Sequence, residues 1–488
     1  MVASTEVERR LHDAGLEGAW AGTPPPGFRA LQIDSRRVSA GDLFCAIPGT
    51  RVDGHDFIDR AAAAGATAAV AERPGESSEL PRFVVRDTRI AAAHLAELFA
   101  GDPARSLDFT GITGTNGKTT TAFLLRHLLS DLGPSAAVGT LGTIHPDGRA
   151  EPGRLTTPDP VSLSATFRAL VDEGARFVAI EVSSHALEQH RADAIPFRLA
   201  IFTNLTRDHL DYHSDMGQYR GAKLRLAGLL RPDGACLVNA DEPAWDGADF
   251  GSAAVLRYGL APRADVRAEA VRFVPGGSEW ELVTPVGRVN VRLPLLGTFN
   301  ISNSLAAAAA AHQSGLEPAA IASGLETAPQ VPGRMEVIAR EPALIVRDYA
   351  HTPDALERAL QALRPSVNGR LIVVFGCGGD RDPGKRPLMG RIGVAGSDLA
   401  LVTSDNPRTE DPAAIVAETV AELEPGSWEA VVDRREAIHR ALETAGPDDG
   451  VLLAGKGHET YQEIGQERVP FDEVEVVARF IASRGAKR

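Results

Sequence analysis

A glycine-rich segment that ends in Gly-Lys-Thr-Thr is the clearest chemical signal in this sequence. Residues 111–120 (GITGTNGKTT) follow a predicted strand and open a predicted helix. In that setting backbone N–H groups and the helix N-terminus face an anion, Lys118 reaches phosphate oxygens, and the Thr119 hydroxyl can ligate Mg²⁺. A strict Walker motif requires glycine where Ile112 stands, and the NKxD string of G-proteins is absent. The loop therefore favours ATP over GTP; the alternative is an ordinary tight turn between a strand and a helix.

Three further polar residues could belong to a metal or acid–base site. Glu181 ends an apolar stretch over 177–182, and doubly wound folds hold Mg²⁺ with acids at the carboxyl ends of strands. His209 lies in a polar loop after another predicted strand, where it could ligate a metal or move a proton. Its alternative role is loop capping. Lys223 lies on a predicted helix, and by itself such a lysine is usually a solvated surface residue.

Strand-like and helical runs alternate along most of the chain, which is typical of α/β folds with parallel sheets covered by helices. The predicted strands cover 30–34, 42–47, 82–85, 107–113, 177–182, 199–203, 343–347, 370–375, 399–403 and 450–454. The predicted helices cover 57–65, 119–132, 162–173, 354–363 and 412–423. Residues 266–291 are predicted to form short antiparallel strands.

The pattern predicts three α/β domains. These are a small amino-terminal domain (1–104), a central domain with a P-loop-type parallel sheet (105–331) and a Rossmann-like carboxy-terminal domain (332–488).

Composition excludes several classes of protein. The 488 residues are 43% apolar and 24% charged, and 51 basic against 65 acidic residues leave a net charge of −14. An acidic chain of this kind argues against a main task in binding nucleic acid or an anionic membrane. Its longest apolar run is far shorter than the roughly 18 residues of a membrane span, and its three cysteines are far apart. We expect a cytoplasmic monomer without membrane insertion and without a nucleic-acid partner.

Taken in order, the motifs of this chain resemble the Mur ligase family, the ATP-dependent amide-bond-forming enzymes of peptidoglycan synthesis. The matching motifs are 114–120 (GTNGKTT), 181–187 (EVSSHAL), 204–213 (NLTRDHLDYH), 296–303 (LGTFNISN), 333–334 (GR) and 348–351 (DYAH). The resemblance covers essentially the whole chain. It implies ATP contacts from Gly114, Thr115, Asn116, Gly117, Lys118, Thr119, Thr120, Asn300, Asn303, Arg334, Asp348 and His351.

The resemblance also changes the interpretation of Lys223. In the family a lysine at this position is carbamylated by CO₂, which would turn a cation into an anion able to hold a second Mg²⁺ beside His209. The first Mg²⁺ would be held by Thr119 and Glu181. The resemblance thus implies ATP and Mg²⁺ as cofactors, a carbamate on Lys223, and catalytic roles for Lys118, Lys223 and His209.

Within the family, the chain is similar to members that add the third residue of the peptide. Its segments 34–36 (DSR), 41–46 (GDLFCA) and 53–55 (DGH) resemble their UDP-binding domain. Arg191 offers a bidentate guanidinium for an anionic substrate, although a surface ion pair is the alternative. The resemblance implies contacts to the nucleotide-sugar and its dipeptide from Ile33, Ser35, Thr50, Arg51, Val52, Thr156, Thr157, Ser183, Gln189 and Arg191.

The segment Asp-Asn-Pro-Arg at 405–408 marks those family members that add diaminopimelate rather than lysine. Diaminopimelate resembles lysine with an extra distal carboxylate, and Arg408 is a planar donor fork suited to that group. By itself, the four-residue string is only a turn signal. The matching amino-acid contacts are Arg381, Asp405, Asn406, Pro407, Arg408, Gly455 and Glu459.

The resemblance implies an ATP-dependent ligase that adds diaminopimelate to UDP-N-acetylmuramoyl-L-alanyl-D-glutamate through an acyl phosphate. We expect the meso isomer, although the residues do not distinguish it from the LL isomer. Arg408 argues against a lysine-adding ligase, and the UDP-type amino-terminal segment argues against a folylpolyglutamate synthase. A P-loop module that has lost ligation would be expected to lack Lys223, His209 or Glu181.

Overall fold

The computed structural model describes residues 1–49, 52–75, 80–209, 212–274 and 276–485 of the chain. The fold divides into two compact units. The first comprises Met1–Arg267 with Asn303–Glu317, and the second Ala268–Ser302 with Pro318–Arg488. Both are built from parallel-rich sheets and helices, which confirms the predicted α/β class. The domain boundaries near residues 104 and 331 stay predictions.

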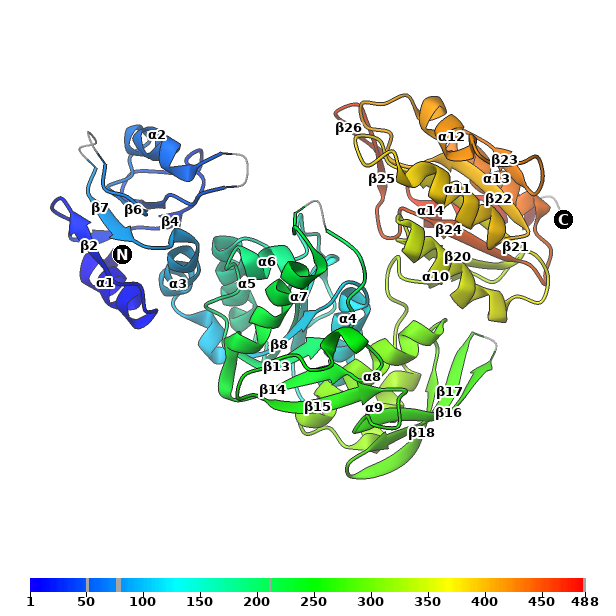
Figure 1. Cartoon of the computed structure of the whole chain (residues 1–488), viewed down its shortest axis with the longest axis horizontal. Helices are drawn as coiled ribbons and strands as arrows, with labels where there is room; N and C mark the ends of the chain where they lie inside the picture. Colours follow the sequence, from blue (N-terminus) through cyan, green and yellow to red (C-terminus); the bar gives the residue numbers. More distant parts are fainter. Residues whose placement is uncertain (50–51, 76–79, 210–211, 275, 486–488) are drawn as a thin grey trace. The chain divides into compact units, whose positions relative to one another are not determined.

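The amino-terminal part of the first unit is a five-stranded sheet between helices (Figure 1). In β5, Leu43 and Cys45 join the apolar core that includes α1 and α3, whereas Phe44 joins the core that includes α2. This alternation is what a strand buried on both faces requires. The sheet order is β2 (Gly18–Ala21), β7 (Arg82–Val85), β6 (Ala68–Ala71), β5 (Leu43–Cys45) and β4 (Leu31–Gln32). The helices are α1 (Ser4–Asp13), α2 (Ile58–Ala63) and α3 (Thr88–Ala100), and a small pair is formed by β1 (Val2–Ala3) and β3 (Gly27–Phe28).

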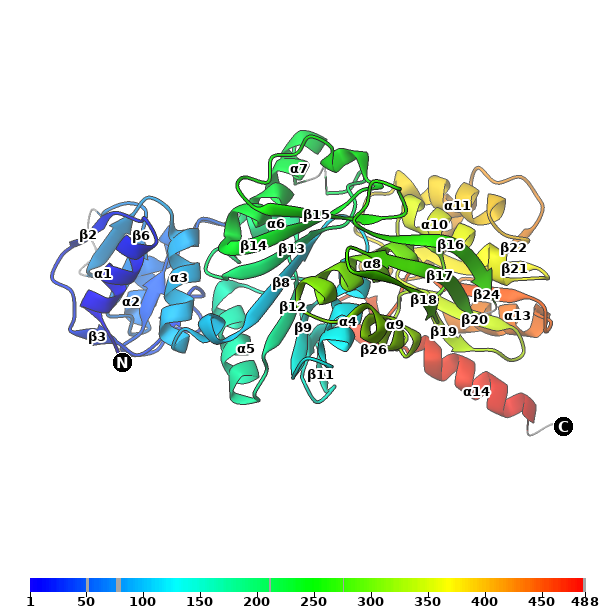
Figure 2. The ribbon, with the colours of Figure 1, turned by 90° about the horizontal axis from the view of Figure 1, so that it is seen from below.

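A larger sheet forms the centre of the first unit, and Figure 2 shows its strands β14, β13, β8, β12 and β9 in this order. Its order up to β15 is β11 (Ala150–Glu151), β10 (Gly142–Ile144), β9 (Ser135–Gly139), β12 (Phe177–Glu181), β8 (Asp108–Thr113), β13 (Phe197–Phe202), β14 (Leu230–Asn239) and β15 (Ala254–Gly259), and β16 (Val266–Val274), β17 (Gly277–Thr284) and β18 (Gly287–Leu293) continue the sheet. The strands from β9 to β15 are parallel. The first residues of β16 (Val266–Val274) pair with β15. Because parallel strands end at the same edge, the loops after β8, β12 and β13 come together there.

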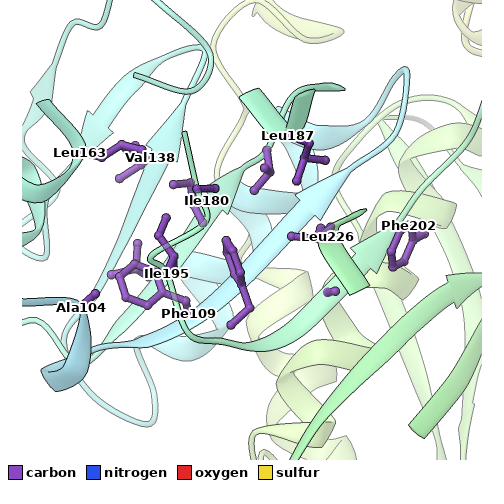
Figure 3. Packing of buried hydrophobic residues seen from close by; sticks show 14 of the residues in the cluster. Ala104, Phe109, Val138, Leu163, Ile180, Leu187, Ile195, Phe202 and Leu226 are labelled. Atoms are coloured by element: carbon purple, nitrogen blue, oxygen red, sulfur yellow. The ribbon is translucent and has the colours of Figure 1, made fainter. Parts of the chain in front are cut away.

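Helices cover both faces of this sheet. On one face Phe109 and Ile180 pack among apolar side chains that include Leu163 and Leu187 (Figure 3). The helices of the first unit are α4 (Lys118–Leu129), α5 (Pro160–Asp172), α6 (Ser184–Glu188) and α7 (Met216–Leu224), while α8 (Thr298–Gln313) belongs to both units. Local signals start them: Asp159 caps α5 ahead of Pro160, and Asp215 caps α7. Side chains of this type satisfy the free N–H groups of a first helical turn.

The second unit contains a six-stranded sheet that is parallel except for β19. Its order is β19 (Glu336–Ala339), β20 (Leu344–Asp348), β24 (Gly450–Ala454), β21 (Leu371–Cys377), β22 (Leu399–Ser404) and β23 (Trp428–Ala430). Its helices are α10 (Pro353–Leu363), α11 (Lys385–Ala395), α12 (Pro412–Val420), α13 (Arg434–Thr444) and α14 (Glu473–Gly485). Along β21, Val373 and Phe375 face α10, α11 and α12, whereas Ile372 and Val374 face α13 and α14. The sheet is therefore buried on both sides.

Two smaller antiparallel elements complete the second unit. β17 (Gly277–Thr284) and β18 (Gly287–Leu293) form an antiparallel hairpin against α9 (Pro318–Glu326), which confirms part of the prediction for residues 266–291. The start of that segment, in β16, instead pairs in parallel with β15. A second hairpin joins β25 (Tyr461–Ile464) and β26 (Glu467–Pro470). None of the helices in the described ranges is both long and apolar enough to cross a membrane.

Candidate active site

The phosphate loop has a backbone that only glycine accommodates at two positions. Gly114 and Gly117 have φ angles of +144° and +86°. A Cβ at Gly114 would overlap Thr203 Oγ1, and one at Gly117 would overlap Asn303 Oδ1. Gly117 precedes the first residue of α4. The glycines therefore allow close packing, and the loop opens onto a helix N-terminus, the usual setting of a phosphate site.

The segment after β13 holds this loop in place through several hydrogen bonds. Thr115 N donates to Asn204 O at 2.7 Å and Asn116 N donates to Asn204 Oδ1 at 2.9 Å. Thr203 Oγ1 donates to Asn116 O at 2.7 Å, and Thr206 N donates to Thr115 Oγ1 at 3.0 Å. The predicted ATP-binding residues 114–120 thus form one preorganised strand–loop–helix unit.

Two lysines converge on one carbonyl of the loop. Lys118 Nζ and Lys223 Nζ donate to Gly114 O at 2.9 and 2.7 Å. Lys223 is 1% exposed, and its amine lies 4.4 Å from the centroid of the Tyr219 ring. Burial, with the charge of Lys118 as a second cause, holds the pKa of Lys223 well below its usual range. The environment therefore favours a neutral amine, and Lys223 is not the solvated lysine that its helical position alone suggested.

Glu181 lies where the first Mg²⁺ ligands were predicted. Its side chain is 2% exposed and accepts hydrogen bonds from Thr119 Oγ1 at 3.0 Å and Thr140 N at 2.8 Å. Buried carboxylate and hydroxyl oxygens at the edge of a phosphate loop are the hard ligands that Mg²⁺ prefers. The pair Thr119 and Glu181 therefore fits this ion.

His209 and Lys223 both lie near the ring of Tyr219. The His209 and Tyr219 ring centroids are 6.1 Å apart, and His185 is 4.8 Å from His209. His209 itself has a φ of +55° and a partly exposed side chain. Within the described ranges no group of three or more His, Cys, Asp or Glu side chains could hold a metal.

The residues predicted to grip the dipeptide form a connected group beside Glu181. Arg191 donates from Nη1 to Thr157 O at 2.8 Å and from Nη2 to Gln189 Oε1 at 2.7 Å. Thr157 Oγ1 donates to Glu181 O at 2.8 Å and accepts from Ser183 N at 3.1 Å. Burial lowers the pKa of Arg191. Its hydrogen-bond partners in the described part of the chain are neutral oxygens, so the surface ion pair considered as an alternative is not formed.

Thr156 belongs to the same neighbourhood, because its hydroxyl lies 3.1 Å from Thr140 Oγ1. Thr140 in turn donates to Glu181. The structure therefore brings all five predicted dipeptide contacts close to the candidate Mg²⁺ ligands.

The predicted nucleotide-sugar contacts that the structure describes come after strands β4 and β5 of the amino-terminal sheet. Ile33 and Ser35 follow β4, and Val52 follows its parallel neighbour β5. Ser35 is buried and Val52 is exposed. Thr50 and Arg51 lie outside the described residues.

Another predicted group lies in the second unit, around Tyr349. The Arg334 guanidinium lies 4.7 Å from the Tyr349 ring centroid, and the His351 ring lies 4.6 Å from it. Asp348 Oδ2 accepts from Met335 N at 2.7 Å. Burial raises the pKa of Asp348, against the opposing charge of Arg334. The structure thus groups Arg334, Asp348 and His351.

The two predicted asparagines on α8 fall in different units. Asn303 packs against Gly117 in the first unit. Asn300, in the second unit, donates from Nδ2 to Leu296 O at 2.8 Å. Asn303 therefore joins the phosphate loop directly.

The loop 405–408 follows β22 and is held by the hairpin β25–β26. Arg408 has a φ of +49°; its N–H donates to Glu463 O at 2.9 Å, and its carbonyl accepts from Gly465 N at 2.7 Å. Its side chain donates from Nε to Glu463 Oε2 at 2.9 Å and from Nη1 to Gly379 O at 2.7 Å. A Cβ at Gly378 would lie 3.1 Å from Arg408 Nη1 and 3.9 Å from Arg381 Cγ. Both predicted arginines therefore flank Gly378.

Two charged residues next to this loop were not among the predicted contacts. Glu463 binds Arg408, as described above. Lys456 is fully buried and donates to Asn406 Oδ1 at 2.9 Å and to Glu459 Oε2 at 3.1 Å, with Asp405 Oδ1 at 3.5 Å. The motif GKGHE at 455–459 contains this lysine, but no local pattern shows that its amine faces the loop 405–408. Only the neighbouring strands β22 and β24 with their following loops bring them together.

Comparison with known proteins bears on what this arrangement does. A curated relative from Geobacillus kaustophilus (strain HTA426), named UDP-N-acetylmuramoyl-L-alanyl-D-glutamate–2,6-diaminopimelate ligase, is 44% identical over 94% of this chain and 96% of its own. A relative of the same name from Geobacter metallireducens (strain ATCC 53774 / DSM 7210 / GS-15) is 46% identical over 94% and 95% of the two chains. The chain belongs to the Mur ligase family.

Three models of Mur ligase domains match successive parts of the chain. They are the catalytic domain of the Mur ligase family (28–102), the Mur ligase middle domain (112–311) and the glutamate ligase domain (333–457). A solved structure titled UDP-N-acetylmuramoyl-L-alanyl-D-glutamate–2,6-diaminopimelate ligase has a TM-score of 0.69 at 35% identity, covering 94% of this Mur ligase and 95% of that chain. MurF from Thermotoga maritima in complex with ADP shares the fold at 21% identity, with a TM-score of 0.64 and coverage of 94% and 98%.

Proposed function

We propose that this Mur ligase joins 2,6-diaminopimelate to UDP-N-acetylmuramoyl-L-alanyl-D-glutamate with the hydrolysis of ATP to ADP and phosphate. The observation that carries the proposal is the whole-length similarity to relatives named for this reaction. The site supports it, because a preorganised phosphate loop lies beside a buried acid and a group of dipeptide-type contacts. The cytoplasmic location and the monomeric state stay predictions.

The proposed chemistry has two steps. The γ-phosphoryl group of ATP passes to the glutamate carboxylate, which makes an acyl phosphate and ADP. An amine of diaminopimelate then attacks the acyl carbon, phosphate leaves, and the nitrogen loses a proton to complete the amide. Activation is needed because a free carboxylate is a poor electrophile.

The residues of the first unit hold and neutralise these anions. Lys118 leaves Gly114 O and Thr115 O to reach the β- and γ-phosphates, while the backbone N–H groups of residues 114–120 surround them. Arg191, with Thr157 and Ser183, orients the dipeptide near Glu181. When bound, Mg²⁺ offsets the negative charge of the phosphates and the substrate carboxylate, and Thr119 and Glu181 are the residues that would hold it.

We further propose that Lys223 is carbamylated and that it binds a second Mg²⁺ together with His209. Its buried amine lies beside another ammonium group at a shared carbonyl, which disfavours a second positive charge. A carbamate at Lys223 would instead place an anion opposite Lys118. The direct measurement is mass spectrometry of the intact protein in bicarbonate. We expect the added mass of one carbamate, and we expect that added mass to disappear on acidification.

The test of the main proposal is a phosphate-release assay with purified protein, ATP and the UDP-muramoyl-dipeptide. One arm receives diaminopimelate, a second receives lysine and a third receives no amino acid. We expect release in the first arm alone, together with the tripeptide product by mass spectrometry. Equal release with lysine would overturn the substrate assignment, and no release in any arm would overturn the reaction.

A further inference from the structure

The ammonium group of Lys456 is the buried centre of the loop cluster formed by Asp405, Asn406 and Glu459. Its side chain is 0% exposed, and Asp405 and Glu459 expose only 8% and 18% of theirs. A buried ammonium is stable only with charged or polar partners, and here it has three. Three of the predicted amino-acid contacts are thus held by a residue that is not itself among them.

Lys456 and the backbone N–H of Glu463 together fix which end of the Asn406 amide faces Glu459. The ammonium group and the backbone N–H of Glu463 can only donate, and both lie within 3.0 Å of the same terminal atom of Asn406. That atom must therefore be the oxygen. The NH₂ group then points the other way and donates to Glu459 Oε2 at 2.9 Å.

The same contacts leave a defined set of groups for a ligand. Lys456 takes up Asp405 Oδ1 and Glu459 Oε2, while Asp405 Oδ2 faces Gly455, where a Cβ would lie only 2.9 Å away. Glycine at 455 keeps that oxygen accessible. The cluster therefore offers N–H donors from Asn406 and Arg408 and a carboxylate oxygen from Asp405, which together match the carboxylate and ammonium of a distal amino-acid end.

We propose that Lys456 is a positioning residue for the amino-acid substrate, acting through Asn406, and that it thereby supports selection for a distal carboxylate. The proposal rests on the proposed function for the identity of the amino acid. Without the ammonium group, the Asn406 oxygen would lose one of its two donors, so the amide would be held less firmly in the orientation that presents its N–H to the ligand.

The first measurement is steady-state kinetics of Lys456→Met, which keeps the length of the side chain and removes its charge. We expect the KM for diaminopimelate to rise at least about tenfold, the scale of one lost charge-assisted hydrogen bond. The KM values for ATP and the UDP-muramoyl-dipeptide should stay within about twofold. Because lysine has no distal carboxylate, the ratio of kcat/KM for diaminopimelate to that for lysine should fall by a similar factor. Arg440→Met, which removes an exposed cation from the same unit, is the control for charge loss.

A double-mutant cycle separates positioning from general loss of structure. If Lys456 acts through Asn406, then Lys456→Met should change the diaminopimelate KM little in an Asn406→Ala background. Full additivity of the two substitutions, or an equal loss for diaminopimelate and lysine, would overturn the proposal. If Lys456→Met does not fold, the effect of this substitution is measured in a Glu459→Gln background instead. The diaminopimelate KM of the double variant is then compared with that of Glu459→Gln alone, and fewer charges are left unpaired.

The wild-type protein separates this inference from the proposed function. Wild-type activity with diaminopimelate tests the reaction, whereas the cycle tests the role of Lys456. If the wild-type protein used lysine instead, the cycle would be run with lysine, and additivity there would still refute positioning through Asn406.

Discussion

Replacing Arg408 by alanine should weaken the use of diaminopimelate without disturbing ATP or the nucleotide-sugar. Arg408 Nε and Nη1 are already bonded to Glu463 and Gly379. Among the described residues, Nη2 is therefore the nitrogen left for a distal carboxylate. The sequence suggested a fully available bidentate fork, whereas the structure leaves its Nε edge occupied.

The structure sets the expected magnitude. A hydrogen bond to a charged group contributes about 1.5–3 kcal/mol, which corresponds to roughly a 10- to 150-fold change in an equilibrium constant. Loss of the side chain leaves Glu463 with a second partner, Arg468 at 3.4 Å, so no unpaired buried carboxylate adds to the effect. We expect the KM for diaminopimelate to rise within that range.

The assay is ADP release with diaminopimelate varied at saturating ATP and UDP-muramoyl-dipeptide, repeated with each of these varied in turn. Arg468→Ala is the matched control, because Arg468 contacts the same Glu463 but its side chain is 65% exposed. Its kinetics should stay close to wild type. A diaminopimelate KM within twofold of wild type in Arg408→Ala, or an equal rise in both variants, would refute the reasoning.

Three further outcomes are expected. Lys223→Ala should lose nearly all activity and regain part of it with added short-chain carboxylic acids, measured by phosphate release; wild-type turnover would contradict the carbamate. Lys118→Ala should lower kcat by roughly 10²–10³-fold through lost charge stabilisation, while calorimetry still detects binding of the UDP-muramoyl-dipeptide; unchanged turnover would mean that the loop is only a turn. Arg434→Met should destabilise the protein by about 3–5 kcal/mol in chemical denaturation, because it leaves the fully buried carboxylate of Glu473 unpaired; a loss under 1 kcal/mol would show that this carboxylate is relieved in another way.

Local physics explains why the phosphate loop could be predicted. Its glycines adopt positive φ angles, and the next residues, Lys118 to Leu129, carry apolar side chains at helical spacing. Both features depend on residues that are close together in the sequence, so they can be predicted from it. The predicted helix over 119–132 begins one residue earlier and ends three residues sooner, which is the usual uncertainty of helix ends.

Some regular elements could not be predicted, because strand pairing with distant segments decides their structure. β6 (Ala68–Ala71) is fully buried but nearly all alanine, so its composition does not distinguish a strand from a helix. Neighbouring strands on both sides supply the hydrogen bonds that make it a strand. Here pairing partners distant in the sequence outweigh local propensity.

The sequence by itself determined the α/β class, the phosphate loop and the ordered set of motifs that carries the family resemblance, because these depend on residue types and short spacings. Only the tertiary structure decided that Lys118 and Lys223 share the carbonyl of Gly114. It also decided that Lys456 is buried against Asn406. The Lys223–Gly114 and Lys456–Asn406 contacts join residues 109 and 50 positions apart, and the order of parallel strands, rather than any local pattern, brings these segments together.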